Sequence, residues 1–129
     1  MVTGSCLCGD VRYTISGKIG DVSHCHCLKC RKAHGSAFSS VAAVDKKYFS
    51  LSCERKLKSY ESSPGKHRYF CSTCGTQIYA KRDDAEHIIL RLGSVDSALP
   101  AIEKNHIWVS EKASWYTIDS NLPQCQEFE

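Results

Sequence analysis

The sequence predicts a mostly β domain of antiparallel sheets, with metal-binding cysteine loops at the ends of strands. Short stretches such as residues 11–16 alternate apolar and polar side chains with the period of a half-buried strand. Strong turn signals separate such stretches, as Ser-Pro-Gly-Lys does at residues 63–66. Cysteines spaced as in metal-binding loops stand beside two of the expected strands, at residues 6 and 8 and at residues 71 and 74.

A single domain over residues 1–129 is expected, because the length is typical of one hydrophobic core. Hydrophobic residues make up 42% and charged residues 24%, as in soluble globular proteins. No apolar run approaches the ~20 residues of a membrane span. The N-terminal residues lack the basic and apolar regions of a secretory signal, so a cytoplasmic protein outside the membrane is expected.

The first half of the chain is organised around a cysteine-rich segment at residues 24–32. The strand at 11–16 follows the first cysteine pair, and Gly9 suits the turn between them because glycine tolerates unusual dihedral angles. Residues 31–35 leave the cysteine-rich segment as one short helical turn that ends at a glycine. Residues 37–44 are small and apolar, which predicts a strand covered on both faces and also fits a buried helix.

A β-hairpin is the clearest element of the second half. Its strands are expected at residues 57–62 and 67–70, and the second strand runs directly into the Cys-x-x-Cys pair that begins at Cys71. Residues 45–48 are expected to form a single capped helical turn before the hairpin. The remaining expected elements are strands at 77–80 and 87–95, a short β-rich run at 106–109 and an irregular tail at 121–129.

The nine cysteines indicate reduced metal ligands rather than disulfide bonds. Their number is odd, their spacings are Cys-x-Cys and Cys-x-x-Cys, and no export signal is present. The formal charge of +3 counts each cysteine as neutral, whereas metal-bound cysteine is a thiolate. Seven thiolates and two zinc ions would bring the net charge to zero, so the sequence does not favour nucleic acid as a partner.

The four cysteines of the two remote pairs are expected to share one metal ion. Two pairs of this spacing can close a Cys₄ tetrahedron around zinc, and because the unfolded chain has no such site, binding would stabilise the fold. Cross-braced arrangements that divide the central cysteines between two ions remain open. The expected ligands of this structural zinc are Cys6, Cys8, Cys71 and Cys74.

The central cysteines Cys25, Cys27 and Cys30 supply three ligands from six consecutive residues. Three protein ligands and one exchangeable position are typical of a catalytic zinc ion, so a second, catalytic zinc is expected here. A closed Cys₃His site and an iron–sulfur cluster are the alternatives. The histidines that could complete a closed site, or act as outer-shell groups or proton shuttles, are His24, His26 and His34.

Several residues outside these groups allow both a functional and a structural interpretation. Cys53 and Cys125 are interpreted as buried free thiols rather than ligands. The cations Arg31, Lys32 and Arg68 could recognise a carboxylate-bearing ligand or be solvated surface. The large aromatic residues are expected in the core or in a pocket wall rather than in a base-stacking platform; they are Trp108, Trp115, Tyr13, Tyr60, Tyr69 and Tyr79.

Four motifs together resemble the family of glutathione-dependent formaldehyde-activating enzymes, which also contains centromere protein V. The resemblance extends from Gly4 to about Pro123, and the grouping of seven cysteines makes it specific. The motifs are Gly-Ser-Cys-Leu-Cys-Gly-Asp-Val-Arg-Tyr at 4–13, Cys-His-Cys-Leu-Lys-Cys-Arg-Lys at 25–32, Tyr-Glu-Ser-Ser-Pro-Gly-Lys-His-Arg-Tyr-Phe-Cys-Ser-Thr-Cys-Gly-Thr at 60–76 and His-Ile-Trp-Val at 106–109.

The resemblance implies a β-tent fold with two zinc ions, divided between the same two cysteine groups as the ligand count suggests. It also implies condensation of formaldehyde with the thiol of glutathione to S-hydroxymethylglutathione, a carbon–sulfur lyase activity. We therefore expect an enzyme that acts on a thiol adduct of a small electrophile. The alternatives are a non-catalytic zinc module that binds a protein or nucleic acid, and a structural protein with two closed zinc sites.

Overall fold

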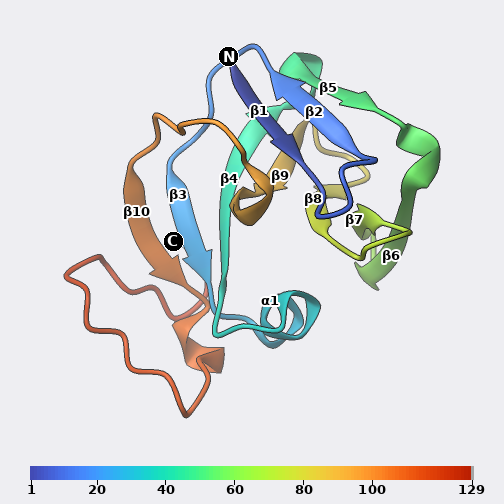
Figure 1. Cartoon of the computed structure of the whole chain (residues 1–129). Helices are drawn as coiled ribbons and strands as arrows, with labels where there is room; N and C mark the ends of the chain where they lie inside the picture. Colours follow the sequence, from blue (N-terminus) through green and yellow to red (C-terminus); the bar gives the residue numbers. More distant parts are fainter. Residues whose placement is uncertain (129) are drawn as a thin grey trace.

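Two β-sheets and one short α-helix make up the computed structural model, which describes residues 1–128 (Figure 1). A three-stranded sheet has the order β1-β2-β5, and a seven-stranded sheet has the order β10-β3-β4-β9-β8-β7-β6. The strands are β1 (Val2–Ser5), β2 (Arg12–Ile15), β3 (Val22–Cys25), β4 (Ser39–Asp45), β5 (Phe49–Ser52), β6 (Leu57–Ser63), β7 (Lys66–Cys71), β8 (Gln77–Arg82), β9 (His87–Arg91) and β10 (Glu103–Ile107).

The two sheets enclose one hydrophobic core. Tyr13 and Ile15 of β2 contribute from the small sheet, while Val44 of β4 and Ile88 and Leu90 of β9 contribute from the large one. Each of these five side chains is no more than 2% exposed. Burial of apolar surface between the sheets is the main favourable term in folding, so this face of the large sheet serves to stabilise the fold.

The helix α1 (Leu28–His34) lies at the end of the large sheet where β3 ends and β4 begins (Figure 1). Cys27 is its N-cap, and the Sγ atom of Cys27 accepts a hydrogen bond of 3.3 Å from the Cys30 amide. Gly35 ends the helix in the left-handed conformation at φ 61°, which costs glycine little. The predicted helical turn is therefore confirmed, with a start three residues earlier than expected.

Most of the predicted strands and turns are present. Asp45 caps the 3₁₀ turn Lys46–Tyr48 through a 3.0 Å hydrogen bond from the Lys47 amide to Oδ1. Gly65 adopts φ 76° at the tip of the β6–β7 hairpin. The strand expected at 87–95 ends earlier, at Arg91, because the chain turns there into the 3₁₀ helix Leu92–Ser94.

Three strands were missed by the sequence prediction, and one pairing differs from it. The missed strands β1, β3 and β5 have four residues each; β2 is equally short, but its alternation of apolar and polar side chains extends over residues 11–16. The strand β10 pairs with β3 in parallel, so the large sheet is mixed rather than wholly antiparallel. Residues 121–128 of the tail, which was expected to be irregular, run beside β10, where the Cys125 amide donates to the His106 carbonyl at 2.8 Å; the last residue of that tail lies outside the described residues.

Within residues 1–128, no helix combines the length and the apolar character that a membrane crossing requires.

Replacing Gly4 by alanine tests how the Tyr13 ring of β2 packs over its neighbouring strand β1. A Cβ atom on Gly4 would lie 2.1 Å from Cζ of Tyr13, whose ring is buried and whose hydroxyl hydrogen-bonds Ser94 Oγ at 2.8 Å. Gly4→Ala is expected to lower the free energy of unfolding by ~1–3 kcal/mol, measured by urea denaturation. Gly93→Ala is the matched control, because no atom lies within 4 Å of its added Cβ, and equal losses in both variants would contradict this account.

Candidate metal centres and the adjoining pocket

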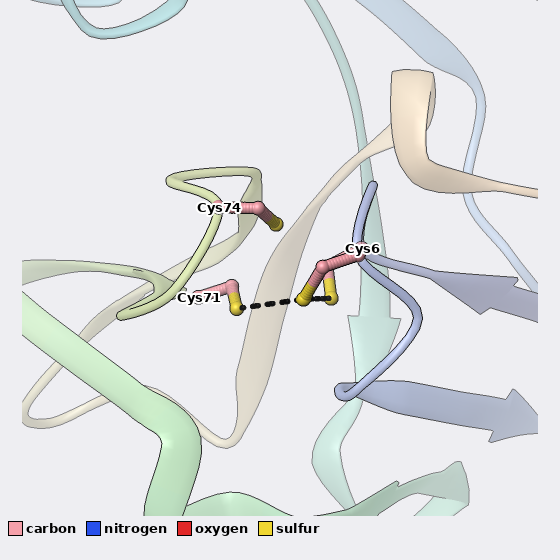
Figure 2. Close-up of side chains that lie close together, drawn as sticks. Cys6, Cys71 and Cys74 are labelled. Carbon is pink, nitrogen blue, oxygen red and sulfur yellow. Dashed lines mark hydrogen bonds between the residues drawn. The ribbon is translucent and has the colours of Figure 1, made fainter.

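The first cysteine group joins the turn after β1 to the turn after β7. Cys6 and Cys8 come from the first turn, Cys71 ends β7 and Cys74 follows it; all four Sγ atoms lie within 4.8 Å of one another. Figure 2 shows the sulfurs of Cys6, Cys71 and Cys74 turned toward a common centre. The separations from Cys8 Sγ are 3.6 Å to Cys6 and 3.8 Å to Cys71. Four sulfurs at ~2.3 Å around zinc would lie ~3.8 Å apart, so this geometry suits a tetrahedral metal ion.

Local hydrogen bonds orient these sulfurs. The Val11 amide donates to Cys6 Sγ at 3.2 Å, and the Thr73 amide donates to Cys71 Sγ at 3.4 Å. Gly9 at φ 83° and Gly75 at φ 79° allow the two turns that bring these amides to the sulfurs. Amide donors favour the thiolate form, which is the form that binds metal.

The pKa values of Cys74 and Cys8 in this group are shifted in opposite directions. A hydrogen bond from the Thr76 hydroxyl lowers the pKa of Cys74 to about 5. The Asp10 amide lowers the pKa of Cys8, but desolvation and hydrogen bonds with the neighbouring thiols outweigh it and raise the value to about 12. A bound cation would remove this conflict by stabilising every thiolate at once.

The second cysteine group lies where β3 passes into α1. Cys25 ends β3, Cys27 caps the helix and Cys30 belongs to its first turn, and the three Sγ atoms lie within 4.8 Å of one another. Cys25 and Cys30 are buried, whereas Cys27 is partly exposed. These three sulfurs could hold a metal ion, with Cys27 on the side nearest to solvent.

Arg68 of β7 forms the closest charge contact with this group. Its Nη1 and Nη2 atoms donate to Cys30 Sγ at 3.7 and 3.6 Å, and its Nε donates to Ser62 Oγ at 2.9 Å. The side chain is 4% exposed, so the guanidinium is a buried cation directed at a sulfur. Such an arrangement stabilises negative charge on Cys30.

The three thiols influence one another strongly. Hydrogen bonds with Cys25 and Cys27 lower the pKa of Cys30, and the charge of Arg91 lowers it further. Hydrogen bonds with Cys27 and Cys30 raise the pKa of Cys25. One thiolate therefore suppresses the ionisation of its neighbour, and a cation among the three sulfurs would relieve this repulsion.

None of the histidines in the described chain joins the second group of sulfurs. His26 shares a 2.7 Å hydrogen bond with His106, and His24 hydrogen-bonds Ser40 Oγ and Glu103 Oε1 at 2.8 and 2.7 Å. Burial and the charge of His106 lower the pKa of His26 to about 4. These rings pack behind the cysteine loop, an arrangement that fits the outer-shell role better than the fourth-ligand role.

Cys25, Cys27 and Cys30 all line a cavity of about 390 Å³. This volume lies within the range of small-molecule sites. Its wall combines apolar side chains of the large sheet with the indole of Trp108 and the ring of Phe128, which pack edge to face at a centroid distance of 5.3 Å. The other residues of the wall that bear on its chemistry are Val41, Ile89, Ile107, Lys66, Arg91, Lys104 and Asp21.

Two of the cations at this cavity, Lys66 and Arg91, were missed by the sequence analysis. A usable signal existed for Arg91, because an arginine interrupts the apolar strand that begins at His87. The expected recognition residues Arg31 and Lys32 lie on α1 and do not line the cavity, whereas Arg68 reaches Cys30.

The remaining candidates are placed as follows. Cys53 and Cys125 are partly rather than fully buried, and they belong to neither cysteine group. Trp108 is part of the cavity wall, as expected for an aromatic residue. Trp115 and Tyr60 are 70% and 68% exposed, so the core placement expected for them is wrong.

Comparison with known proteins identifies related chains. The sequence model of a family described as "Glutathione-dependent formaldehyde-activating enzyme" matches residues 1–111. A protein of Aspergillus flavus is 29% identical over 114 residues, which are 85% of this chain and 53% of that protein. A protein of Podospora anserina is 31% identical over 116 residues, 88% of this chain and 49% of that protein. Both carry the name "Putative glutathione-dependent formaldehyde-activating enzyme", and this chain spans about half of their length.

A solved structure also resembles this one. The crystal structure of a Rhodobacter sphaeroides protein superposes with a TM-score of 0.64 and 21% sequence identity, covering 76% of this chain and 91% of the other. The similarity confirms the mostly β fold.

Removing one sulfur from the first group should cost both metal and stability. Cys8→Ser is expected to lose about one metal equivalent per chain and to lower the melting temperature by more than ~5 °C, because the metal would join two turns distant in sequence. Metal analysis and thermal denaturation measure the two effects. Cys53→Ser serves as the control outside both groups; unchanged metal content in Cys8→Ser would contradict the assignment.

Proposed function

The chain belongs to the family of glutathione-dependent formaldehyde-activating enzymes, and we propose that it is a zinc enzyme that joins a small thiol to an aldehyde. In this proposal Cys25, Cys27 and Cys30 would hold the catalytic ion, and the substrate thiol would bind in the cavity that these residues line. Glutathione and formaldehyde are the proposed substrates, giving S-hydroxymethylglutathione, and the reverse reaction makes the activity a carbon–sulfur lyase. The names of the matched relatives support this choice.

The observation that carries the proposal is the cavity beside the three sulfurs. A closed structural site would bury its metal behind a fourth protein ligand, whereas here no described histidine joins the group and Cys25, Cys27 and Cys30 all face a 390 Å³ cavity. Three thiolates with an open fourth side are typical of a catalytic zinc ion. The first group, with four sulfurs, suits a structural zinc held by Cys6, Cys8, Cys71 and Cys74.

The chemistry requires a thiolate and an aldehyde held side by side. When bound, zinc supplies a positive charge that favours the thiolate form of the substrate or polarises the aldehyde oxygen. The sulfur–carbon bond forms as the carbonyl π bond breaks, and the thiol proton ends on the new hydroxyl oxygen. Arg68 offsets charge on Cys30, and the apolar wall that includes Ile107 and Trp108 limits water around the reacting atoms.

Substitution of Cys27 tests this assignment directly. Cys27→Ser is expected to fold, to retain about one zinc equivalent instead of two and to lose at least ~10-fold in turnover, because one of three ligands is gone. Exchange between formaldehyde and its glutathione adduct, followed by nuclear magnetic resonance, measures the rate above the spontaneous reaction.

Cys125→Ser is the matched control, since that thiol belongs to neither cysteine group. Full turnover in zinc-replete Cys27→Ser would refute the catalytic role. Wild-type protein that holds two zinc ions but accelerates neither direction of the reaction would favour the non-catalytic module instead.

A further inference from the structure

Arg91 is a buried cation with unused hydrogen-bond donors beside the second cysteine group. The side chain is 2% exposed, and its Nε and Nη2 atoms have no hydrogen-bond partner. It lines the same cavity as Cys25, Cys27 and Cys30. Leaving charged donors buried and unpaired is costly, so a site that retains them is built for a group that arrives from outside the chain.

The pairing register of the large sheet places further cations on the same face. Residues directly opposite in paired strands share a face, as do residues two apart in one strand. Arg91 lies two residues from Ile89, which pairs with Ala80, and Ala80 pairs with Arg68. Lys66 lies two residues before Arg68 in β7, so all three cations project from one face. Cys25 at the end of β3 lies on that face too. It pairs with Ser39 of β4, and Val41, two residues further along β4, pairs with Arg91.

The charges on this face exceed what the metal centre requires. Three thiolates and one divalent ion leave a single negative charge, which the Arg68 contact with Cys30 offsets. Burial together with the charges of Arg68 and Arg91 lowers the pKa of Lys66, a sign of crowded positive charge. Asp21 and Lys104 also line the cavity, but both are exposed, so water screens them more than the buried cations.

We propose that Arg91 and Lys66 form an anion-binding subsite of the cavity and select thiol substrates that carry a carboxylate. This inference rests on the proposed function and names the feature of the thiol that the chain recognises. A bound substrate thiolate adds one negative charge and its carboxylate a second, which matches the two cations left after Arg68. The planar guanidinium of Arg91 has two adjacent unpaired donors, Nε and Nη2, suited to the two oxygens of a carboxylate; both atoms are enclosed in this structure, so the guanidinium must turn toward the cavity when the carboxylate binds.

A purely structural role for Arg91 makes a different prediction. Its charge also favours ionisation of Cys30, so it could serve only to stabilise the thiolates. In that case the charge of the substrate's distal group would not affect binding. Two thiols of equal size that differ in this charge therefore separate the two roles.

The test measures thiol binding to the full chain with cobalt in place of zinc, since ligand binding at a thiolate-bound cobalt ion changes its visible absorption. The two probes are 3-mercaptopropionate and its neutral analogue 3-mercaptopropionamide. The wild-type protein is expected to bind the carboxylate at least ~10-fold more tightly, a difference of ~1.4 kcal/mol. Lys66→Met and Arg91→Gln are expected to reduce this preference at least ~3-fold while amide binding stays unchanged, and Lys58→Met on β6 is the exposed control.

Each result decides the question. Equal binding of both thiols by the wild-type protein overturns the subsite but leaves the proposed function standing, because a thiol still reaches the metal. If Lys66→Met and Arg91→Gln both keep the preference for the carboxylate thiol, the assignment of the subsite to these two residues is overturned. Absorption that responds to neither thiol refutes the proposed function itself. If Arg91→Gln loses its metal, the Lys66→Met result alone decides, since Lys66 contacts no cysteine sulfur by hydrogen bond.

Discussion

The arrangement of the site depends on the strand register of the seven-stranded sheet. Side chains alternate between faces, so a slip of one residue in β9 would move Arg91 into the hydrophobic core and expose Leu90 to the cavity. The correct register is enforced by burial, because Ile88 and Leu90 are no more than 1% exposed on the core face. Core packing on one face thus determines the position of charge on the other.

The two cysteine groups use different means to stabilise negative sulfur. In the first group, Cys6 and Cys71 belong to the hydrophobic core cluster and receive backbone amide hydrogen bonds. In the second group, Cys27 Sγ also accepts a backbone amide hydrogen bond, but Cys30 is in addition contacted by a buried guanidinium from a distant strand. Amides are permanent parts of a turn, whereas a side-chain cation can be positioned to serve both a ligand and a substrate. This difference accords with a structural role for the first group and a catalytic role for the second.

Local features of the site could be predicted from the sequence, and features that depend on pairing could not. Cys25, Cys27 and Cys30 lie within one loop and one helical turn, so their spacing can be recognised in the sequence alone. The hairpin around Gly65 and the helix end at Gly35 are equally local, because each needs a left-handed residue at a defined position. The cavity required knowledge of how β3, β4 and β9 pair.

Arg68 and Arg91 illustrate this limit. They are 23 positions apart in the sequence, yet their faces are related through β8, whose Ala80 pairs with Arg68 on one side and with Ile89 on the other. Sequence inspection finds an arginine inside an apolar strand but not its partners. Ala80 itself is fully buried on the face that relates the two arginines, so neighbouring side chains cover it completely. A bulky residue at that position would have to displace the side chains packed on Ala80 and would disturb the placement of both arginines.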